Sequence, residues 1–232
     1  MINMNMRNKL IKLCRLTQEQ LKQHMIWELK ALLGNVTVGD GYVLAKGDFP
    51  VLLVAHLDTV HSQLPEDIVY DELEDVLSSA QGIGGDDRCG VLMILELIHK
   101  HRCSVLLCED EEQHGVGAMK FVTSKDIDGL FFNYIIEFDR KGSNDAVFYK
   151  CANQAFIDFV TADYYQQDYG TFSDICVVAP RIGCAAVNLS CGYYNAHTLS
   201  EYVVIKEMQD CIDAADRLLG RTKETDKFGF DD

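Results

Sequence analysis

The sequence has little proline, little tryptophan and no excess of positive charge. Its 232 residues include 3 prolines and 1 tryptophan, so we expect no proline-rich linker. The formal net charge of −15 disfavours partners such as nucleic acid and anionic membrane surfaces, because both select basic patches. No apolar run is long enough to span a bilayer, and residues 1–15 lack the apolar core and cleavage site of a secretory signal. We therefore expect a soluble protein that binds neither nucleic acid nor membranes.

The sequence also lacks the cysteine spacing of a structural zinc site or a disulfide framework. Its 9 cysteines are scattered, their number is odd, and no Cys-x-x-Cys pair occurs. Several lie in apolar runs: Cys103, Cys108, Cys176 and Cys184. This distribution predicts reduced, mostly buried thiols and a cytoplasmic location.

The composition predicts a globular protein with a substantial core. A hydrophobic content of 48% and a charged content of 25% are ordinary for such a chain. The length fits one domain, and we find no internal repeat or low-complexity tract. We expect a single domain over residues 1–232, in which residues 221–232 form a charged, flexible tail.

Strand and helix patterns alternate along the chain. Thr17 and Gln20 match a capping box, and apolar residues at helical spacing then run to Gly34, which suits a helix end. Residues 35–46 read as a hairpin. Further helices are expected over 91–99, 117–124, 154–167 and 201–219, and strands over 51–55, 68–70, 76–78, 104–107, 134–136 and 185–189. This alternation predicts an α/β three-layer sandwich with a mostly parallel central sheet flanked by helices.

Carboxylates and imidazoles follow the apolar strands. The residues just past the predicted strand ends are His56, Asp58, Glu111, Glu112 and Asp139, and Asp86 and His197 lie in polar turns. In open α/β sheets the carboxyl edge of the strands is where ligands bind. The acidic run over residues 109–112 is either fully solvated or neutralised by cations. Convergence of these side chains at one edge would provide the ligand types that hold zinc.

Five blocks in this order resemble those of the co-catalytic di-zinc exopeptidases, a superfamily that includes peptidase T, the glutamate carboxypeptidases and the leucyl-type aminopeptidases. The blocks are residues 56–60, residues 85–90, residues 110–112, Asp139, and residues 195–203. The resemblance implies that His56, Asp86 and Asp139 hold one zinc ion and that Glu112, Asp86 and His197 hold the other. Asp86 would then bridge both ions, and Co²⁺ or Mn²⁺ would suit the same ligands.

The resemblance also implies roles for residues that are not ligands. Glu111 matches the general base, and Asp58 matches the carboxylate that orients His56. Members of the superfamily often have a cis peptide bond after the bridging aspartate, so we expect one between Asp86 and Asp87.

The sequence departs from the superfamily pattern at several positions. Arg88 stands where lysine is commoner and is expected to pair locally. His114 stands where glycine is usual, and either lines the substrate pocket or is exposed. Asp174, in a segment that resembles the border of the substrate cleft, either orients an amine or a loop or caps a helix. Glu137 is a weaker alternative to Asp139 as a ligand.

The chain has no room for the lid and dimerisation domain of peptidase T. Roughly thirty residues separate Asp139 from Gly170, which is too few for a domain. The lid's substrate-binding arginines and its trans-acting histidine are therefore missing. The architecture is closer to that of the single-domain aminopeptidases, so we expect a monomer or a weak homo-oligomer.

The sequence thus predicts a zinc-dependent metallopeptidase, most simply an aminopeptidase or other small-peptide exopeptidase. Its substrate would be a small peptide. An N-acyl amino acid deacylase is the alternative enzyme, since resembling sites also catalyse that reaction. A catalytically inactive metal-binding or interaction protein of the same fold is the alternative from another class. The pattern leaves the side-chain preference and the native metal open.

Overall fold

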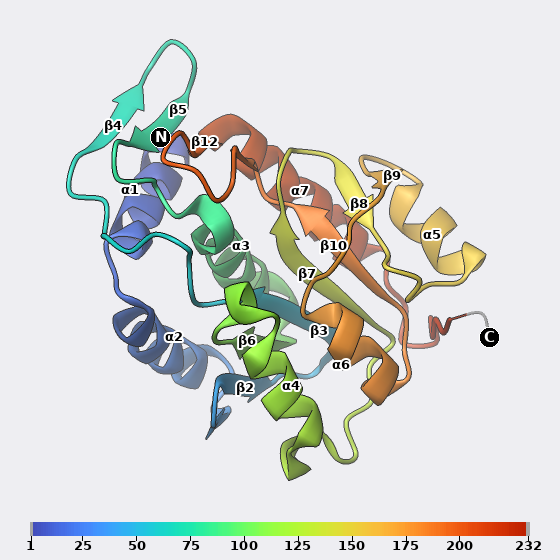
Figure 1. Cartoon of the computed structure of the whole chain (residues 1–232). Helices are drawn as coiled ribbons and strands as arrows, with labels where there is room; N and C mark the ends of the chain where they lie inside the picture. Colours follow the sequence, from blue (N-terminus) through green and yellow to red (C-terminus); the bar gives the residue numbers. More distant parts are fainter. Residues whose placement is uncertain (1, 231–232) are drawn as a thin grey trace.

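The computed structural model describes residues 2–230, whose strands and helices alternate along much of the chain (Figure 1). The helices are α1 (Ile2–Cys14), α2 (Gln18–Leu32), α3 (Gly85–His101), α4 (Val116–Thr123), α5 (Gln154–Thr161), α6 (Ile175–Ile182) and α7 (Ile205–Gly220), with 3₁₀ turns η1 (Glu111–Gln113) and η2 (Lys125–Ile127). The strands are β1 (Asn35–Gly39), β2 (Tyr42–Lys46), β3 (Phe49–His56), β4 (Ile68–Asp71), β5 (Val76–Ser79), β6 (Cys103–Cys108), β7 (Tyr134–Arg140), β8 (Asp145–Val147), β9 (Gln166–Asp168), β10 (Ala186–Ser190), β11 (Tyr193–Tyr194) and β12 (Tyr202–Val204).

The larger sheet has the strand order β1-β2-β6-β3-β7-β10-β8-β9. Its centre, β6-β3-β7-β10, is parallel, while β2 pairs antiparallel with β6, and β8 pairs antiparallel with β10. All residues of β6 and all but the first two of β3 are buried. Strands covered on both faces read as continuous apolar runs, which is why the sequence revealed them. The predicted α/β architecture with a mostly parallel central sheet is confirmed.

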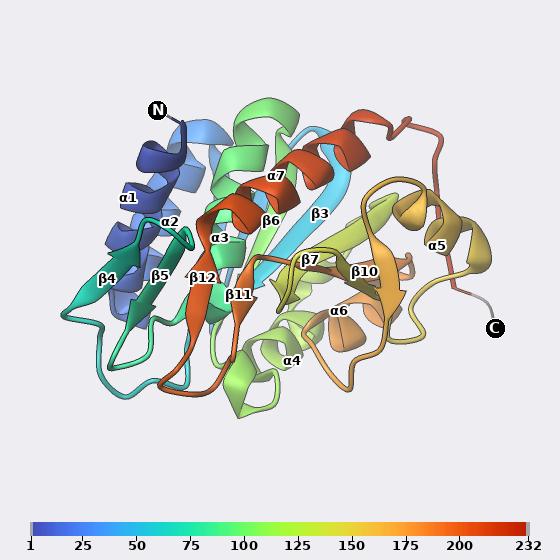
Figure 2. The same ribbon diagram turned by 90° about the horizontal axis from the view of Figure 1, so that it is seen from above.

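Helices cover both faces of this sheet (Figures 1 and 2). On one face lie α4 and α6, and Phe121 and Val178 from these helices join Leu106 of β6 in one apolar cluster. On the other face lie α3 and α7, together with α1 and α2, and their apolar side chains form a second and larger cluster. Because both faces are covered, the carboxyl ends of the parallel strands are the part of the sheet left for ligands.

A smaller antiparallel sheet, with the strand order β11-β12-β5-β4, lies beside the larger one (Figure 2). Tyr202 of β12 pairs with Ser78 of β5, and Tyr193 of β11 pairs with Val203 of β12. The β4–β5 hairpin projects from the body of the molecule (Figure 1). The connection between β11 and β12 carries His197.

The start of α2 and the cis peptide bond are as predicted. The Thr17 hydroxyl accepts a hydrogen bond from the Gln20 backbone N–H, the Gln20 side chain accepts one from the Thr17 N–H, and the capping box is complete. Gly34 follows the helix with a φ of 83°, which suits glycine. The peptide bond between Asp86 and Asp87 is cis.

Two predicted helix boundaries are wrong. The helix expected over 154–167 ends at Thr161, because residues 166–168 pair with β8 as a strand. The helix expected over 201–219 begins at Ile205, because residues 202–204 pair with β5. Helix α1 was not predicted, and α6 was anticipated only as the helix that Asp174 would cap. In each case a pairing or packing partner distant in sequence decides the local structure.

Among residues 2–230, no helix is both long enough and apolar enough to cross a membrane. The cysteines are free thiols, and all except Cys176 are buried, as their distribution predicted.

Candidate metal centre

The predicted site residues converge at the carboxyl edge of the larger sheet. His56 is the last residue of β3, Glu111 and Glu112 follow β6 in η1, and Asp139 is the second-last residue of β7. These three strands are neighbours, so their ends meet. Asp86 reaches the same point from the start of α3. Asp139 lies within its strand and not past its end, which corrects the sequence-based placement.

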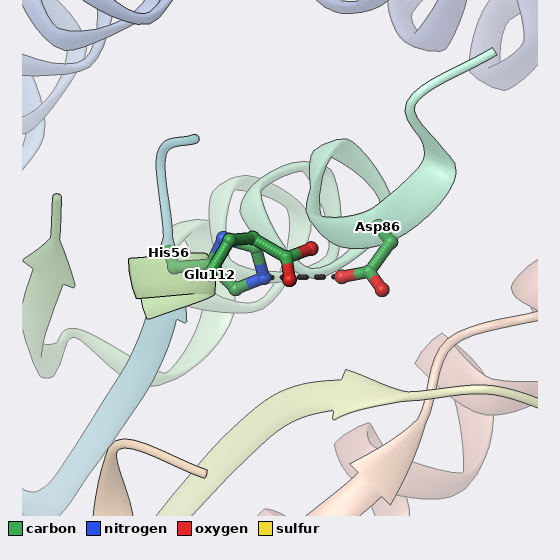
Figure 3. A group of neighbouring side chains, drawn as sticks. All are labelled: His56, Asp86 and Glu112. Atoms are coloured by element: carbon green, nitrogen blue, oxygen red, sulfur yellow. Dashed lines mark hydrogen bonds and ion pairs between the residues drawn. The ribbon is translucent and has the colours of Figure 1, made fainter. Parts of the chain in front are cut away.

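His56 is at the centre of the group and is fully buried. Its Nδ1 lies 3.1 Å from an Asp58 carboxylate oxygen, and its Nε2 lies 3.0 Å from Asp86 Oδ1 and 3.5 Å from Asp139 Oδ1. Figure 3 shows His56, Asp86 and Glu112 pointing toward one another. Burial lowers the pKa of His56, but the three carboxylates outweigh it and raise that pKa well above its usual value.

Asp58 connects His56 to the acidic turn after β6. One Asp58 oxygen accepts a hydrogen bond from the Glu111 backbone N–H at 3.0 Å, and the other accepts one from the Glu112 N–H at 3.0 Å. Burial raises the pKa of Asp58, but His56 and the two backbone N–H groups outweigh it, so the pKa is lowered. Asp58 therefore holds both the imidazole and the segment that carries the two glutamates.

Asp86 presents one carboxylate oxygen to each of two histidines. Its Oδ1 faces His56, and its Oδ2 lies 3.2 Å from Nε2 of His197, which in turn lies 2.9 Å from Glu112 Oε1. Proximity to Asp86 raises the pKa of His197 to about 9. The His197 side chain is 55% exposed, whereas His56 is buried. The two imidazoles thus approach one carboxylate from the core and from the solvent side.

The turn after β6 aims the two glutamates into the site. Asp110 and His114, on either side of η1, have φ values of 59° and 70°, which reverse the chain within a few residues. Burial, with Asp139 adding to it, raises the pKa of Glu111 to about 8. Burial, with Asp86 adding to it, raises the pKa of Glu112 to about 7. Several carboxylates therefore share a space that disfavours their negative charges.

The donor set fits a divalent metal centre. When Nδ1 of His56 donates to Asp58, a deprotonated Nε2 presents a lone pair that a metal ion can accept in place of a proton, beside carboxylate oxygens that are also metal ligands. Oε1 of Glu112 is buried, and its 2.9 Å contact with Nε2 of His197 lacks the geometry of a hydrogen bond. The ligand atoms of His56, Asp86 and Glu112 all lie within 4.8 Å of one another. Cations among these atoms would satisfy the acceptors and offset the clustered charge.

The ligand atoms of Asp87, His56 and Asp139 also lie within 4.8 Å of one another. The Asp87 carboxylate already accepts hydrogen bonds from the backbone N–H groups of His56 and Gly90, at 3.1 and 2.9 Å. Asp87 therefore organises the start of α3 and the end of β3 through backbone contacts.

Asp139 is supported by residues that the sequence did not single out. The Asn188 side chain accepts a hydrogen bond from the Asp139 backbone N–H at 2.9 Å, and the Tyr193 hydroxyl donates to Asp139 Oδ1 at 3.2 Å. Glu137, the weaker ligand candidate, is fully buried and accepts a hydrogen bond from the Ser173 hydroxyl. Only the pairing of β7 with β10 brings Asn188 and Asp139 together.

Arg88 pairs with backbone oxygens. Its guanidinium donates to the carbonyl oxygens of Leu57 at 3.0 Å, Asp58 at 2.6 Å and Leu16 at 3.3 Å. Arg88 is only 2% exposed. A buried guanidinium with several donors can hold this loop against the α1–α2 connection, because its planar fork reaches several acceptors at once.

His114 lies on the surface, whereas Asp174 lies in the interior. His114 is exposed and does not line the cavity at the site. Asp174 precedes α6, but its side chain accepts no capping hydrogen bond, so the interpretation as a helix cap is wrong. Asp174 is fully buried, and burial raises its pKa to about 7.

A cavity of about 600 Å³ opens beside the site. Asp86, Glu111, Asp139 and His197 line it on the side of the site. Its other walls include Arg140, Lys141, Tyr149, Phe172 and Tyr194. This volume is in the range of small-molecule binding sites.

Comparisons with known proteins find similar folds among solved structures. No family model matches the sequence, and a search of curated proteins finds no match. Aminopeptidase APDkam598 from Desulfurococcus kamchatkensis superposes with a TM-score of 0.74 at 14% identity, over 96% of each chain. A tripeptidase from Staphylococcus aureus Mu50 gives 0.72 at 11% identity, over 94% of this chain and 97% of that chain. Aminopeptidase PepT from Bacillus cereus ATCC 10987 gives 0.71 at 12% identity, over 94% of this chain and 98% of that chain.

At these identities the likeness establishes a shared fold. The chain has the α/β fold of these aminopeptidases, which is the fold that the five sequence blocks implied.

Proposed function

We propose that this protein is a di-zinc metallohydrolase that cleaves peptide bonds, as an aminopeptidase or small-peptide exopeptidase. The observation that carries the proposal is the placement of Asp86, whose two oxygens face two different histidines. A carboxylate in this position suits a bridge between two ions, with His56 and Asp139 on one side and Glu112 and His197 on the other. The fold shared with known aminopeptidases supports the same function.

Each side of the proposed centre would have three protein ligands, which leaves a position for water or substrate. Zinc bound there would lower the pKa of a water molecule and polarise the scissile carbonyl. Asp58 would hold the His56 tautomer and the turn that carries Glu111, through the hydrogen bonds described above. Glu111 would act as general base, taking a proton from the attacking water onto its carboxylate and delivering it to the leaving amine.

The cavity beside the site supports a small substrate. A volume of about 600 Å³ accommodates a short peptide, and Tyr149, Phe172 and Tyr194 offer aromatic surface for its side chains. Because all the proposed ligands come from one chain, we propose that the protein acts as a single catalytic domain, as a monomer or weak homo-oligomer. We also propose a cytoplasmic location, which the buried free thiols support.

The proposal is tested with Glu111→Gln, which keeps the size of the side chain and removes its basicity. We expect the variant to bind two zinc ions per chain, as the wild type would, and to lose about 10²–10⁴-fold in kcat on a peptide substrate. Metal content is measured by elemental analysis, and turnover is measured on aminoacyl-anilides and on N-acyl amino acids. Exposed Gln113, in the same turn, gives the control variant Gln113→Ala.

Near-wild-type turnover of Glu111→Gln would remove the assignment of the general base. A wild-type protein that binds no zinc, or that hydrolyses neither substrate class, would refute the proposed function. Cleavage of N-acyl amino acids but not of aminoacyl-anilides would favour the deacylase instead.

A further inference from the structure

Glu201 is a fully buried carboxylate that joins three loops of the site. One of its oxygens accepts a hydrogen bond from the backbone N–H of Asp86 at 2.9 Å. The other accepts one from the N–H of Gly84 at 2.9 Å and lies 2.7 Å from Nε2 of His61. Glu201 itself comes from the connection between β11 and β12, four residues after His197. It therefore connects the His197 loop with the Asp86 loop and with the segment after β3.

The contacts around this carboxylate are close-packed. A Cβ atom on Gly85 would lie 2.8 Å from Val203 Cγ2, so the Asp86 loop lies directly against β12. A Cβ atom on Gly82 would lie 2.2 Å from the His61 ring, so this ring packs on the Gly82 backbone. The His61 side chain is only 6% exposed. His61 belongs to none of the sequence blocks, and its burial and its contact with Glu201 make it a structural residue.

A buried carboxylate keeps its place only when its oxygens are satisfied. Two backbone N–H groups donate hydrogen bonds to Glu201. Among the described residues, the His61 ring is the one side-chain donor within hydrogen-bond distance of this carboxylate. Without His61, one Glu201 oxygen would keep only the Gly84 N–H. The Asp86 N–H is held by the same carboxylate, so a displaced Glu201 would release the residue whose two oxygens must face His56 and His197.

We propose that His61 and Glu201 are positioning residues that hold the Gly84–Asp86 loop in its metal-binding conformation. The inference rests on the proposed metal centre and extends it by two residues. Groups that orient metal ligands commonly contribute 10–100-fold to metal affinity. Because Asp86 faces both histidines, the loss should affect both bound ions.

The test compares two histidine–carboxylate pairs. His61→Phe keeps a ring on Gly82 and removes the donor to Glu201, whereas His61→Gln keeps a donor at the end of its side chain. His101 lies 2.6 Å from Asp216 at the far end of α3, so His101→Phe removes a similar pair away from the site. Zn²⁺ affinity is measured for each purified protein by competition with a chromophoric chelator, and melting temperature is measured without metal.

We expect His61→Phe to lower Zn²⁺ affinity at least tenfold, whereas the affinity of His61→Gln should stay within about threefold of wild type. His101→Phe should bind Zn²⁺ like wild type, even if its melting temperature changes. Glu201→Gln places an amide NH₂ against a backbone N–H. Glu201→Gln should also weaken Zn²⁺ binding at least tenfold. If His61→Phe does not fold, the affinity of Glu201→Gln tests the inference in its place. Unchanged affinity in both His61→Phe and Glu201→Gln, or an equal loss in His101→Phe, would overturn this inference alone. Absence of Zn²⁺ binding by the wild type would instead overturn the proposed function.

Discussion

Asp58 offers the sharpest test of how the site is held together. Its carboxylate accepts hydrogen bonds from three donors: the His56 ring, the Glu111 N–H and the Glu112 N–H. Asp58→Asn replaces one acceptor oxygen with an NH₂ group. Whichever way the amide is turned, at least one of the three donors then faces another donor.

The expected loss of stability follows from the number of donors left without an acceptor. Asp58 is only 6% exposed, and leaving a buried donor without its acceptor costs about 1–3 kcal/mol, so Asp58→Asn should lower the free energy of unfolding by that amount. Asp58→Ala removes the acceptor for all three donors and should cost more, out of a total stability of about 5–15 kcal/mol. The loss of the carboxylate behind His56 should also weaken zinc binding by about 10–100-fold.

Urea unfolding of the chelator-treated proteins measures the first effect, and zinc titration measures the second. Asp71→Asn is the matched control. Asp71 accepts hydrogen bonds from the backbone N–H groups of Leu73 and Glu74 in the exposed β4–β5 hairpin. We expect Asp71→Asn to leave zinc affinity unchanged. An Asp58→Asn protein with wild-type stability and wild-type zinc affinity would refute the role assigned to Asp58.

Two further predictions concern the histidines and a remote ion pair. His56→Ala and His197→Ala should both lower the zinc content found by elemental analysis. Because only His56 is buried, only His56→Ala should also lower the melting temperature of the metal-free protein by several degrees. Equal melting temperatures of the two variants would contradict the burial argument. Burial raises the pKa of Asp216, but hydrogen bonds from Lys100 and His101 outweigh it and leave that pKa below its usual 3.8. The contacts of Asp216 should therefore stabilise the protein above pH about 4 and lose this contribution as the pH falls further. The difference in urea midpoint between wild type and Asp216→Asn should shrink below that pH. A difference that stays constant would contradict this pH dependence.

The central strands and most of the site could be read from the sequence because their patterns are local. A strand covered on both faces has to be apolar throughout, which marks β3 and β6. Polar residues directly after such runs lie at the carboxyl edge, so the apolar runs alone suffice to place His56 and the acidic run after β6 at the same edge. The boundaries near residues 166 and 202 were missed because pairing with β8 and β5 decides them.

The supporting residues could not be read in the same way. Arg88 and Glu201 stand in blocks that resemble the superfamily, but nothing in the sequence indicates their partners, which, like that of Asn188, lie far away along the chain. Each becomes recognisable only when burial removes water and leaves a specific acceptor or donor within reach. His61, five residues after His56, carries no spacing signal that distinguishes it from an exposed histidine.

By itself the sequence determined which ligand types this protein carries and at which strand ends they lie, because side-chain chemistry and apolar runs are properties of short segments. The tertiary structure alone decided their orientation. That Asp86 offers one oxygen to each histidine depends on loops held from outside, by Asp58 on one side and by Glu201 on the other. Hydrogen bonds across long sequence distances set those loop conformations, because a buried polar group accepts only a partner that the whole fold places within reach.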